Sequence, residues 1–130
     1  PETVADYYMG RMRYRETEEI ILVMTDNKNR MICDRVLSQG TVNCSLMSPR
    51  EVFLMALEYH AVHILLVHNH PSGDASPSRQ DIEMTEHLAG LCEMMQLPLL
   101  DHIIVGDNCY VSFRESGLLG TESPQQLRSL

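Results

Sequence analysis

The sequence has few basic residues. Ten Lys and Arg stand against 18 Asp and Glu, which gives a formal net charge of −8 and a pI near 5.1. Proteins that bind nucleic acid regardless of its sequence do so through clustered Lys and Arg, which neutralise phosphates. We therefore expect no direct nucleic-acid binding by this chain, and any role near DNA would be indirect or belong to a segment outside it.

Paired cysteines and long apolar runs are also missing. The four Cys residues are scattered and form no C-x-x-C pair, which disfavours a disulfide framework or a thiolate zinc site and favours a reducing, cytoplasmic setting. No stretch approaches the roughly 20 apolar residues that span a bilayer, so we expect no membrane partner. The first fifteen residues are polar and charged, unlike a secretory signal peptide.

The length and composition predict one domain. A chain of 130 residues with 44% apolar content can bury its own core but is too short for two ordinary domains. We expect residues 1–15 to form a short helix or a surface arm, residues 16–119 to form the domain, and residues 120–130 to be a polar tail. Because the chain begins with Pro1 rather than Met, we expect it to be part of a longer protein.

The first half of the domain contains strand and helix signals. EEIILVMTDNKNRMICDRVL predicts two strands around a turn at 26–29, and GTVNCSLM predicts a third short strand after Gly40. Ser48 before Pro49, with Glu51 at the third helical position, predicts the start of a capped helix. The apolar face of this helix comprises Val52, Met55, Ala56 and Tyr59.

The second half alternates strands with one helix. HILLV at 63–67 is short and continuously apolar, which is typical of a central strand. Ser78 can cap a second helix with Asp81 at its third position, and Pro98 would end it. LLDHIIVG and CYVSF predict two further strands, so the fold class is α/β or α+β with a sheet between helices. The inner stripe of the second helix comprises Ile82, Thr85, Leu88, Ala89, Cys92 and Met95.

The sequence HNHPSGDASPSRQD, residues 68–81, follows the HILLV strand and contains a candidate metal site. His68 and His70 are two residues apart, so on an extended chain both imidazoles leave the same face and can meet one metal ion. Asp81 follows in the first turn of the next helix. Two His and one carboxylate leave a coordination position for water, as in catalytic zinc sites, although such a set can also hold iron.

Such a site needs a carboxylate that accepts the proton of the attacking water. Asp74 lies in the loop, and Glu18 and Glu19 stand where the first strand begins. Simpler interpretations also apply: H-x-H occurs in exposed loops, Ser78 with Asp81 can be an N-cap with a favourable charge, and the two Glu fit a charged strand edge. The remaining histidines, at surface or core positions without paired spacing, are His60, His63, His87 and His102.

The motif resembles a known one. H-x-H followed by ten residues and Asp, with Pro after the second His and Ser three before the Asp, resembles the JAMM motif of the MPN (JAB) metalloprotease fold. With SPRE upstream and LLDHIIVGDNCYVSFRESGLL downstream, the chain looks like the bacterial RadC-like branch from about Glu16 to Leu119.

The resemblance implies a mixed, mostly antiparallel sheet flanked by helices, an architecture shared with cytidine deaminases. It also implies Zn²⁺ held by His68, His70 and Asp81, an oxyanion donor at Ser78 and a general base at Glu18, with Glu19 as the alternative. Because side chains alternate along a strand, only one of these two glutamates points at the metal. Asn69 departs from the Ser or Thr that deubiquitinating members usually carry.

The function implied is zinc-dependent hydrolysis of a peptide or isopeptide-like amide in a protein of a family labelled DNA repair. The alternative is a non-catalytic MPN-fold interaction module associated with DNA repair or mobile elements. Nothing here resembles the helix-hairpin-helix segment that family members often carry. A nucleobase deaminase is disfavoured because no P-C-x-x-C follows. An exposed edge strand near the start of the domain could support a homodimer.

Overall fold

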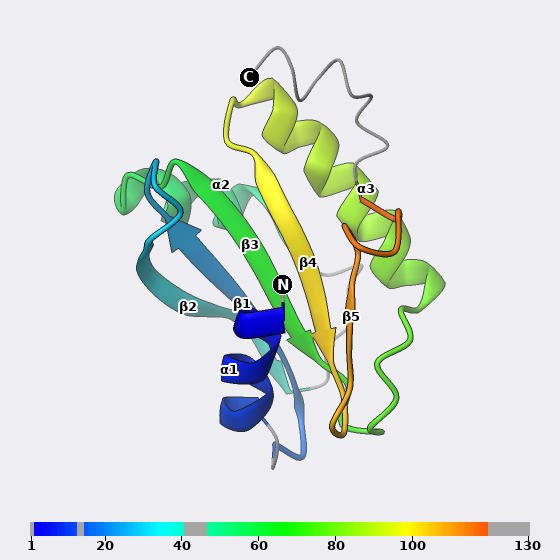
Figure 1. Ribbon diagram of the computed structural model, residues 1–130. Helices are drawn as coiled ribbons and strands as arrows, with labels where there is room; N and C mark the ends of the chain where they lie inside the picture. The colour runs from blue at the N-terminus through cyan, green and yellow to red at the C-terminus, as the bar shows by residue number, and fades with distance from the viewer. Residues whose placement is uncertain (1, 13–14, 41–46, 120–130) are drawn as a thin grey trace.

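A five-stranded sheet with the strand order β2-β1-β3-β4-β5 forms the centre of the computed structural model (Figure 1), which describes residues 2–12, 15–40 and 47–119. Of the strand pairs within these ranges, only β3–β4 is parallel, so the expected mixed, mostly antiparallel sheet flanked by helices is confirmed. The strands are β1 (Glu18–Thr25), β2 (Met31–Gly40), β3 (His63–Asn69), β4 (Leu99–Val105) and β5 (Tyr110–Ser112), and the helices are α1 (Glu2–Met12), α2 (Pro49–Glu58) and α3 (Arg79–Met94).

The central strands are buried on both faces, which explains their continuous apolar runs. Along β1, Ile20, Leu22 and Met24 belong to the core shared with α2 and α3. The alternate residues Ile21 and Val23 belong to a second core, which α1 covers on the face toward the viewer in Figure 1. The alternation of side chains thus decides which helix each residue meets.

Both predicted helix caps are present. The Ser48 hydroxyl accepts a hydrogen bond from the Glu51 amide at 3.4 Å, with Pro49 in the first helical position, and α2 buries Val52 and Ala56. On the inner stripe of α3, Thr85, Leu88 and Cys92 are buried. The predicted inward position of Met95 is wrong: the helix ends at Met94, and the Met95 side chain is 47% exposed because the chain turns toward β4 there.

Several expectations fall on residues outside the described ranges. These are most of the third strand predicted after Gly40, the polar tail at 120–130, and Cys44. Among the described cysteines, Cys33, Cys92 and Cys109 are free thiols. None of the helices in the described ranges has the length and apolar character that crossing a bilayer requires.

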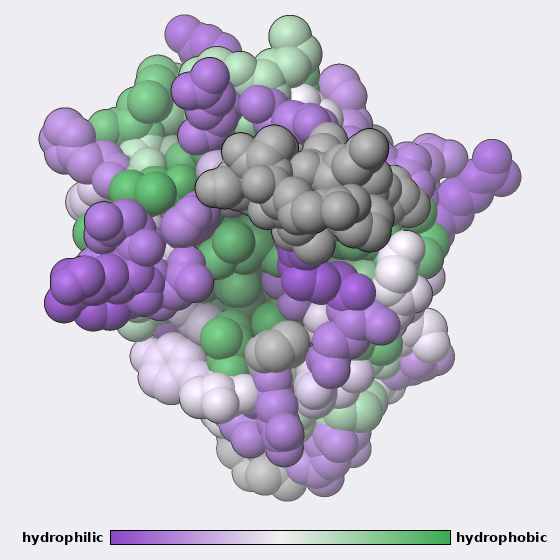
Figure 2. All heavy atoms as spheres, turned by 45° about the horizontal axis from the view of Figure 1, so that its top comes forward, coloured by the Kyte–Doolittle hydropathy of each residue, from purple (hydrophilic) through white to green (hydrophobic). Residues whose placement is uncertain are grey.

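The surface combines hydrophilic regions with apolar ones. Figure 2 shows the end of the molecule that lies at the top of Figure 1, where hydrophobic side chains gather near the middle of a mostly hydrophilic face. Strand β2 is an edge strand of the sheet and exposes Met31, Ile32 and Val36. Self-association of two copies through this edge stays a prediction.

Helix α1 is tied to the sheet by both packing and polar contacts. Ala5, Tyr8 and Met12 are buried against the sheet. The Tyr8 hydroxyl donates a hydrogen bond to the Asp34 carboxylate on β2 at 2.6 Å, and the Arg11 guanidinium donates a second. Burial alone would raise the pKa of Asp34, but these two hydrogen bonds outweigh it and hold the pKa below 3.8.

We expect Asp34→Asn to remove an acid-dependent part of the stability. A carboxylate with a lowered folded-state pKa stabilises the fold above its unfolded pKa, and this contribution is lost as the pH falls through the folded value. Near pH 7 the variant should be about 1 to 2 kcal/mol less stable, and below pH 3.8 the difference should shrink. Urea unfolding across this pH range measures both effects. Glu83→Gln, at an exposed pair with Arg79, is the control. If the free energy of unfolding of Asp34→Asn differed from that of the wild type by the same amount at every pH, Asp34 would not be the source of the acid-dependent stability.

Candidate metal centre

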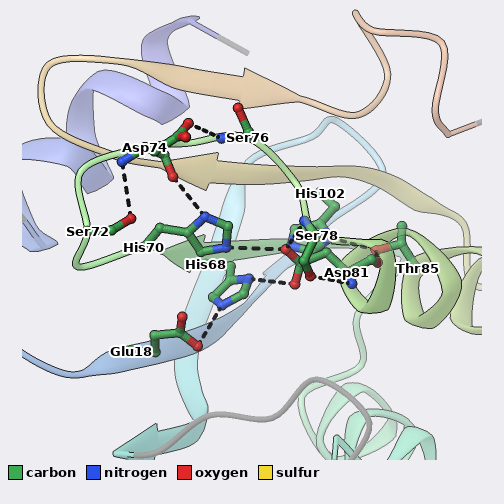
Figure 3. Close-up of polar contacts among 10 residues, drawn as sticks. All are labelled: Glu18, His68, His70, Ser72, Asp74, Ser76, Ser78, Asp81, Thr85 and His102. Carbon is green, nitrogen blue, oxygen red and sulfur yellow. Dashed lines mark hydrogen bonds and ion pairs between the residues drawn. The ribbon is translucent and has the colours of Figure 1, made fainter.

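Four side chains converge at one end of the sheet (Figure 3): Glu18 of β1, His68 of β3, His70 of the loop after β3, and Asp81 of α3. In the antiparallel register of β1 and β3, Ile20 lies opposite His68. His68 therefore shares the sheet face of Ile64 and Leu66, on the side of α3, and its side chain is 1% exposed. Glu18, two residues before Ile20, leaves β1 on the same face. The first residues of β1 thus lie beside the last of β3.

The polar atoms of this cluster are close to one another. His68 Nε2 lies 3.4 Å from Glu18 Oε2, and His68 Nδ1 lies 3.5 Å from Asp81 Oδ1. His70 Nε2 lies 3.2 Å from Asp81 Oδ2. The Asp81 carboxylate therefore faces both imidazoles, and His68 lies between two carboxylates (Figure 3).

The first turn of α3 orients Asp81. The Asp81 amide donates to the Ser78 hydroxyl at 3.0 Å, and the Ser78 amide donates to Asp81 Oδ2 at 2.8 Å, which is a reciprocal capping box. Ser78 is thus the N-cap of α3, as the simpler interpretation of the sequence predicts. Its hydroxyl oxygen accepts in this contact, so its own proton can still be donated to another group.

The loop after β3 fixes the orientation of the His70 ring. His70 Nδ1 lies 2.9 Å from the carbonyl oxygen of Asp74, and because a carbonyl only accepts, Nδ1 carries the proton. In the neutral ring, Nε2 then directs a lone pair toward Asp81. The hydrogen bond with Asp81 raises the pKa of His70. Burial lowers the pKa of His68, against the attraction of the Asp81 charge.

These atoms fit a divalent cation. The ligand atoms of Glu18, His68 and His70 all lie within 4.8 Å of one another, and Asp81 contacts both histidines. His68 Nδ1 is buried without a hydrogen-bond partner in the described part of the chain. An imidazole lone pair that faces a carboxylate is stable only with a cation between them, which is either a proton or a metal ion. Two imidazoles and a carboxylate are ligands that zinc accepts.

Glu19 and Asp74 lie apart from the cluster. Glu19 alternates to the other face of β1, is 3% exposed, and has Oε1 at 3.6 Å from the Arg15 guanidinium. The Asp74 carboxylate turns toward the Ser76 amide at 2.9 Å. Of the three candidate carboxylates upstream of α3, the structure therefore brings only Glu18 to the histidines.

His102 and Thr85 were missed as neighbours of the site. The His102 ring stacks on His68, with 5.8 Å between centroids, and on Phe113. Its Nδ1 lies 2.6 Å from the Thr85 hydroxyl, which also donates to the Asp81 carbonyl at 2.7 Å. Burial lowers the pKa of His102 to about 3, so the ring is neutral. Sequence placed His102 at a surface or a satisfied core position, but it is fully buried and its Nε2 has no partner among the described residues.

Two adjoining hollows open at the cluster. One of about 280 Å³ contains the four converging side chains together with Ser78 and Gln80. The other, of about 340 Å³, lies between α1 and the turn after β4. Both are lined by His70, Pro71 and Ser72, so they adjoin at this segment. We call the first hollow the groove, and a substrate chain in it would lie beside the candidate ligands.

We expect about one zinc per chain in wild-type protein, lost in His68→Ala, His70→Ala and Asp81→Ala, because each removes one of the three predicted ligands. Inductively coupled plasma mass spectrometry on protein purified without a metal-affinity tag gives the metal content. His87→Ala, at an exposed position of α3, is the matched control and should retain the metal. If the wild type takes up no zinc, even when zinc is offered at neutral pH, the prediction of a metal site is wrong, and residues 68–81 form only a loop followed by a helix cap.

The chain is similar to known proteins over most of its length. The model of a family described as RadC-like JAB domain matches residues 1–118. A UPF0758 protein of Bacillus licheniformis is 44% identical over 119 residues, which are 92% of this chain and 53% of that protein. A UPF0758 protein of Caldanaerobacter subterraneus is 44% identical over 117 residues, covering 90% of this chain and 50% of that protein.

A third relative has a similar level of identity. A UPF0758 protein of Methanosarcina acetivorans is 42% identical over 119 residues, which are 92% of this chain and 52% of that protein. The chain spans about half the length of the curated relatives it matches. The names of these relatives state no activity.

Proposed function

The chain belongs to the RadC-like JAB domain family, and on that premise we propose that it is a zinc-dependent hydrolase of the JAMM type. The bond cleaved is a peptide or isopeptide-like amide. The observation that carries this proposal is the convergence of Glu18, His68, His70 and Asp81 at the mouth of one groove. A scaffold domain has no physical need for a buried carboxylate aimed at two imidazoles beside such a groove.

His68, His70 and Asp81 would hold the ion. Zn²⁺ bound there would lower the pKa of a water molecule to about 7 and polarise the carbonyl of the substrate. The contact between His70 Nδ1 and the Asp74 carbonyl keeps Nε2 available as a ligand atom. The capping box keeps the Asp81 carboxylate turned toward both imidazoles.

Glu18 has the position of a general base. Its side chain is 30% exposed and lines the groove, while its Oε2 lies 3.4 Å from the buried His68. A carboxylate at the border between protein and solvent can accept a proton from water and return it to the leaving amine. Glu19, on the other face of β1, cannot reach the same place.

Ser78 stands where it can stabilise the developing oxyanion. Its hydroxyl lines the same hollow as His68 and Glu18. The amide of Asp81 donates to Ser78 Oγ, which orients the hydroxyl and leaves its proton for the substrate oxygen. A fixed donor of this kind stabilises charge in the transition state without reorganising.

We expect Glu18→Gln to lower kcat by about 10² to 10⁴ when both the variant and the wild type are saturated with zinc, because the amide cannot accept the proton. The zinc-loaded chain is assayed on a panel of peptides and lysine isopeptides. Glu19→Gln is the comparison and should retain most of the activity. Equal activities in Glu18→Gln and wild type would remove Glu18 from this role. If wild type with a full complement of zinc cleaves no member of the panel, the interaction module becomes the better interpretation.

Ser78→Ala should lower kcat by about 10² to 10³ through loss of the oxyanion donor. It also loses an N-cap, which costs about 0.5 to 2 kcal/mol of stability. Ser48→Ala is a matched control, since it removes the N-cap of α2 away from the groove. Thermal unfolding should shift similarly in both variants, whereas only Ser78→Ala should lose activity. Equal losses of activity would show that Ser78 acts only as a cap.

A further inference from the structure

Asn69 separates the two histidines but points away from them. Side chains alternate along a strand, so Asn69 leaves β3 on the face opposite to His68, and it is 3% exposed. A buried amide group is costly unless its donor and acceptor are both satisfied. The partners of Asn69 therefore show what this position requires.

Both partners of the Asn69 side chain are backbone groups that flank Glu18. Its Oδ1 accepts a hydrogen bond from the Glu19 amide at 2.6 Å. Its Nδ2 donates to the Thr17 carbonyl at 3.0 Å. These two groups belong to the peptide units on either side of Glu18, so one side chain fixes both. We call this pair of contacts the Asn69 bridge.

The bridge lies where the pairing between the two strands ends. The register of β1 with β3 runs from Thr25 opposite His63 to Ile20 opposite His68 and goes no further. Glu18 and Glu19 are paired with β2 alone. Toward β3, the Asn69 bridge replaces the backbone hydrogen bonds that a longer strand pair would form. It does so around Glu18, whose side chain contacts His68.

The chemistry of the bridge is specific to a primary amide. An amide group carries an acceptor and a donor on two adjacent atoms, as a peptide unit does. A carboxylate at this position would only accept, and a hydroxyl would have a single oxygen with which to reach both groups. Asn69 thus matches the N–H and C=O pair of β1 as a neighbouring strand would.

We infer that Asn69 is a positioning residue that holds Glu18 at the metal centre through its backbone. This inference rests on the proposed function, since it concerns the placement of the proposed general base. The Glu18 carboxylate reaches His68 at 3.4 Å from a part of β1 that lies beyond the last residue pair of the β1–β3 register. A displacement of about 1 Å at a catalytic group can lower a rate about 10²-fold.

The first test is a double-mutant cycle on zinc affinity, measured by competition with a chelator. Asn69→Ala and Glu18→Gln should each weaken zinc binding about 10- to 100-fold, as loss of a partner near a metal does. The double variant should bind zinc no more weakly than the single variant with the lower zinc affinity, because a displaced Glu18 no longer contributes to binding. Asn69→Ser, which keeps a small polar side chain, replaces Asn69→Ala if that variant does not fold.

Thr25→Val is the matched control. Thr25 lies at the opposite end of the same strand pair, is 7% exposed, and donates to the His63 carbonyl at 3.3 Å. It should lower stability about as much as Asn69→Ser while zinc affinity stays at the wild-type value. Its effect should add to that of Glu18→Gln.

The second test is amide hydrogen exchange. The Glu19 amide should exchange roughly tenfold faster in the Asn69 variants than in Thr25→Val, because it loses its acceptor. The inference would be overturned if the two substitutions had additive effects on zinc affinity, or if Glu18→Gln had no effect on it. Unchanged exchange of the Glu19 amide in the Asn69 variants would also overturn it. If wild type binds no zinc, the proposed function fails, and the exchange rates alone decide whether Asn69 holds this backbone.

Discussion

The buried carboxylate of Asp81 is the constraint on which the rest of the centre depends. Its side chain is 2% exposed, and an ionised carboxylate removed from water costs several kcal/mol unless its oxygens are matched. Here the Ser78 amide satisfies Oδ2, and the rings of His68 and His70 approach the two oxygens. The helix N-terminus adds a favourable partial positive charge. Each neighbouring element is placed so that this charge can stay inside the protein.

The surrounding packing holds the candidate ligands in place. His102 is neutral and stacks between His68 and Phe113, so the imidazole of His68 rests on a rigid aromatic surface rather than on solvent. The Thr85 hydroxyl joins this ring to the backbone of Asp81 one helical turn away. The polar centre thus contacts the apolar core beneath α3, and a substitution in one would change the packing of the other.

Local patterns were enough to predict the parts of the centre that are close in sequence. The Ser78 and Asp81 spacing is a helix cap whatever the fold, and H-x-H after HILLV places two imidazoles at a strand end. The choice of Glu18 over Glu19 needs the register Ile20 with His68, which sequence does not contain. The roles of His102 and Asn69 were not predicted because their partners lie in other elements, far away in the sequence. The error at Met95 has a local cause, since helical periodicity does not show where the helix stops.

The single parallel pair in the sheet affects how the centre is assembled. Strands β1 and β2 are joined by a short turn and can pair early, because the loop to be closed is small. Strands β3 and β4 become neighbours only after the chain has run through α3, which also carries Asp81. We therefore expect the three candidate ligand side chains to come together late, in a nearly complete fold. An ion captured there would bind the native state and not the early hairpin, and its binding free energy would add to global stability in proportion to the logarithm of its concentration.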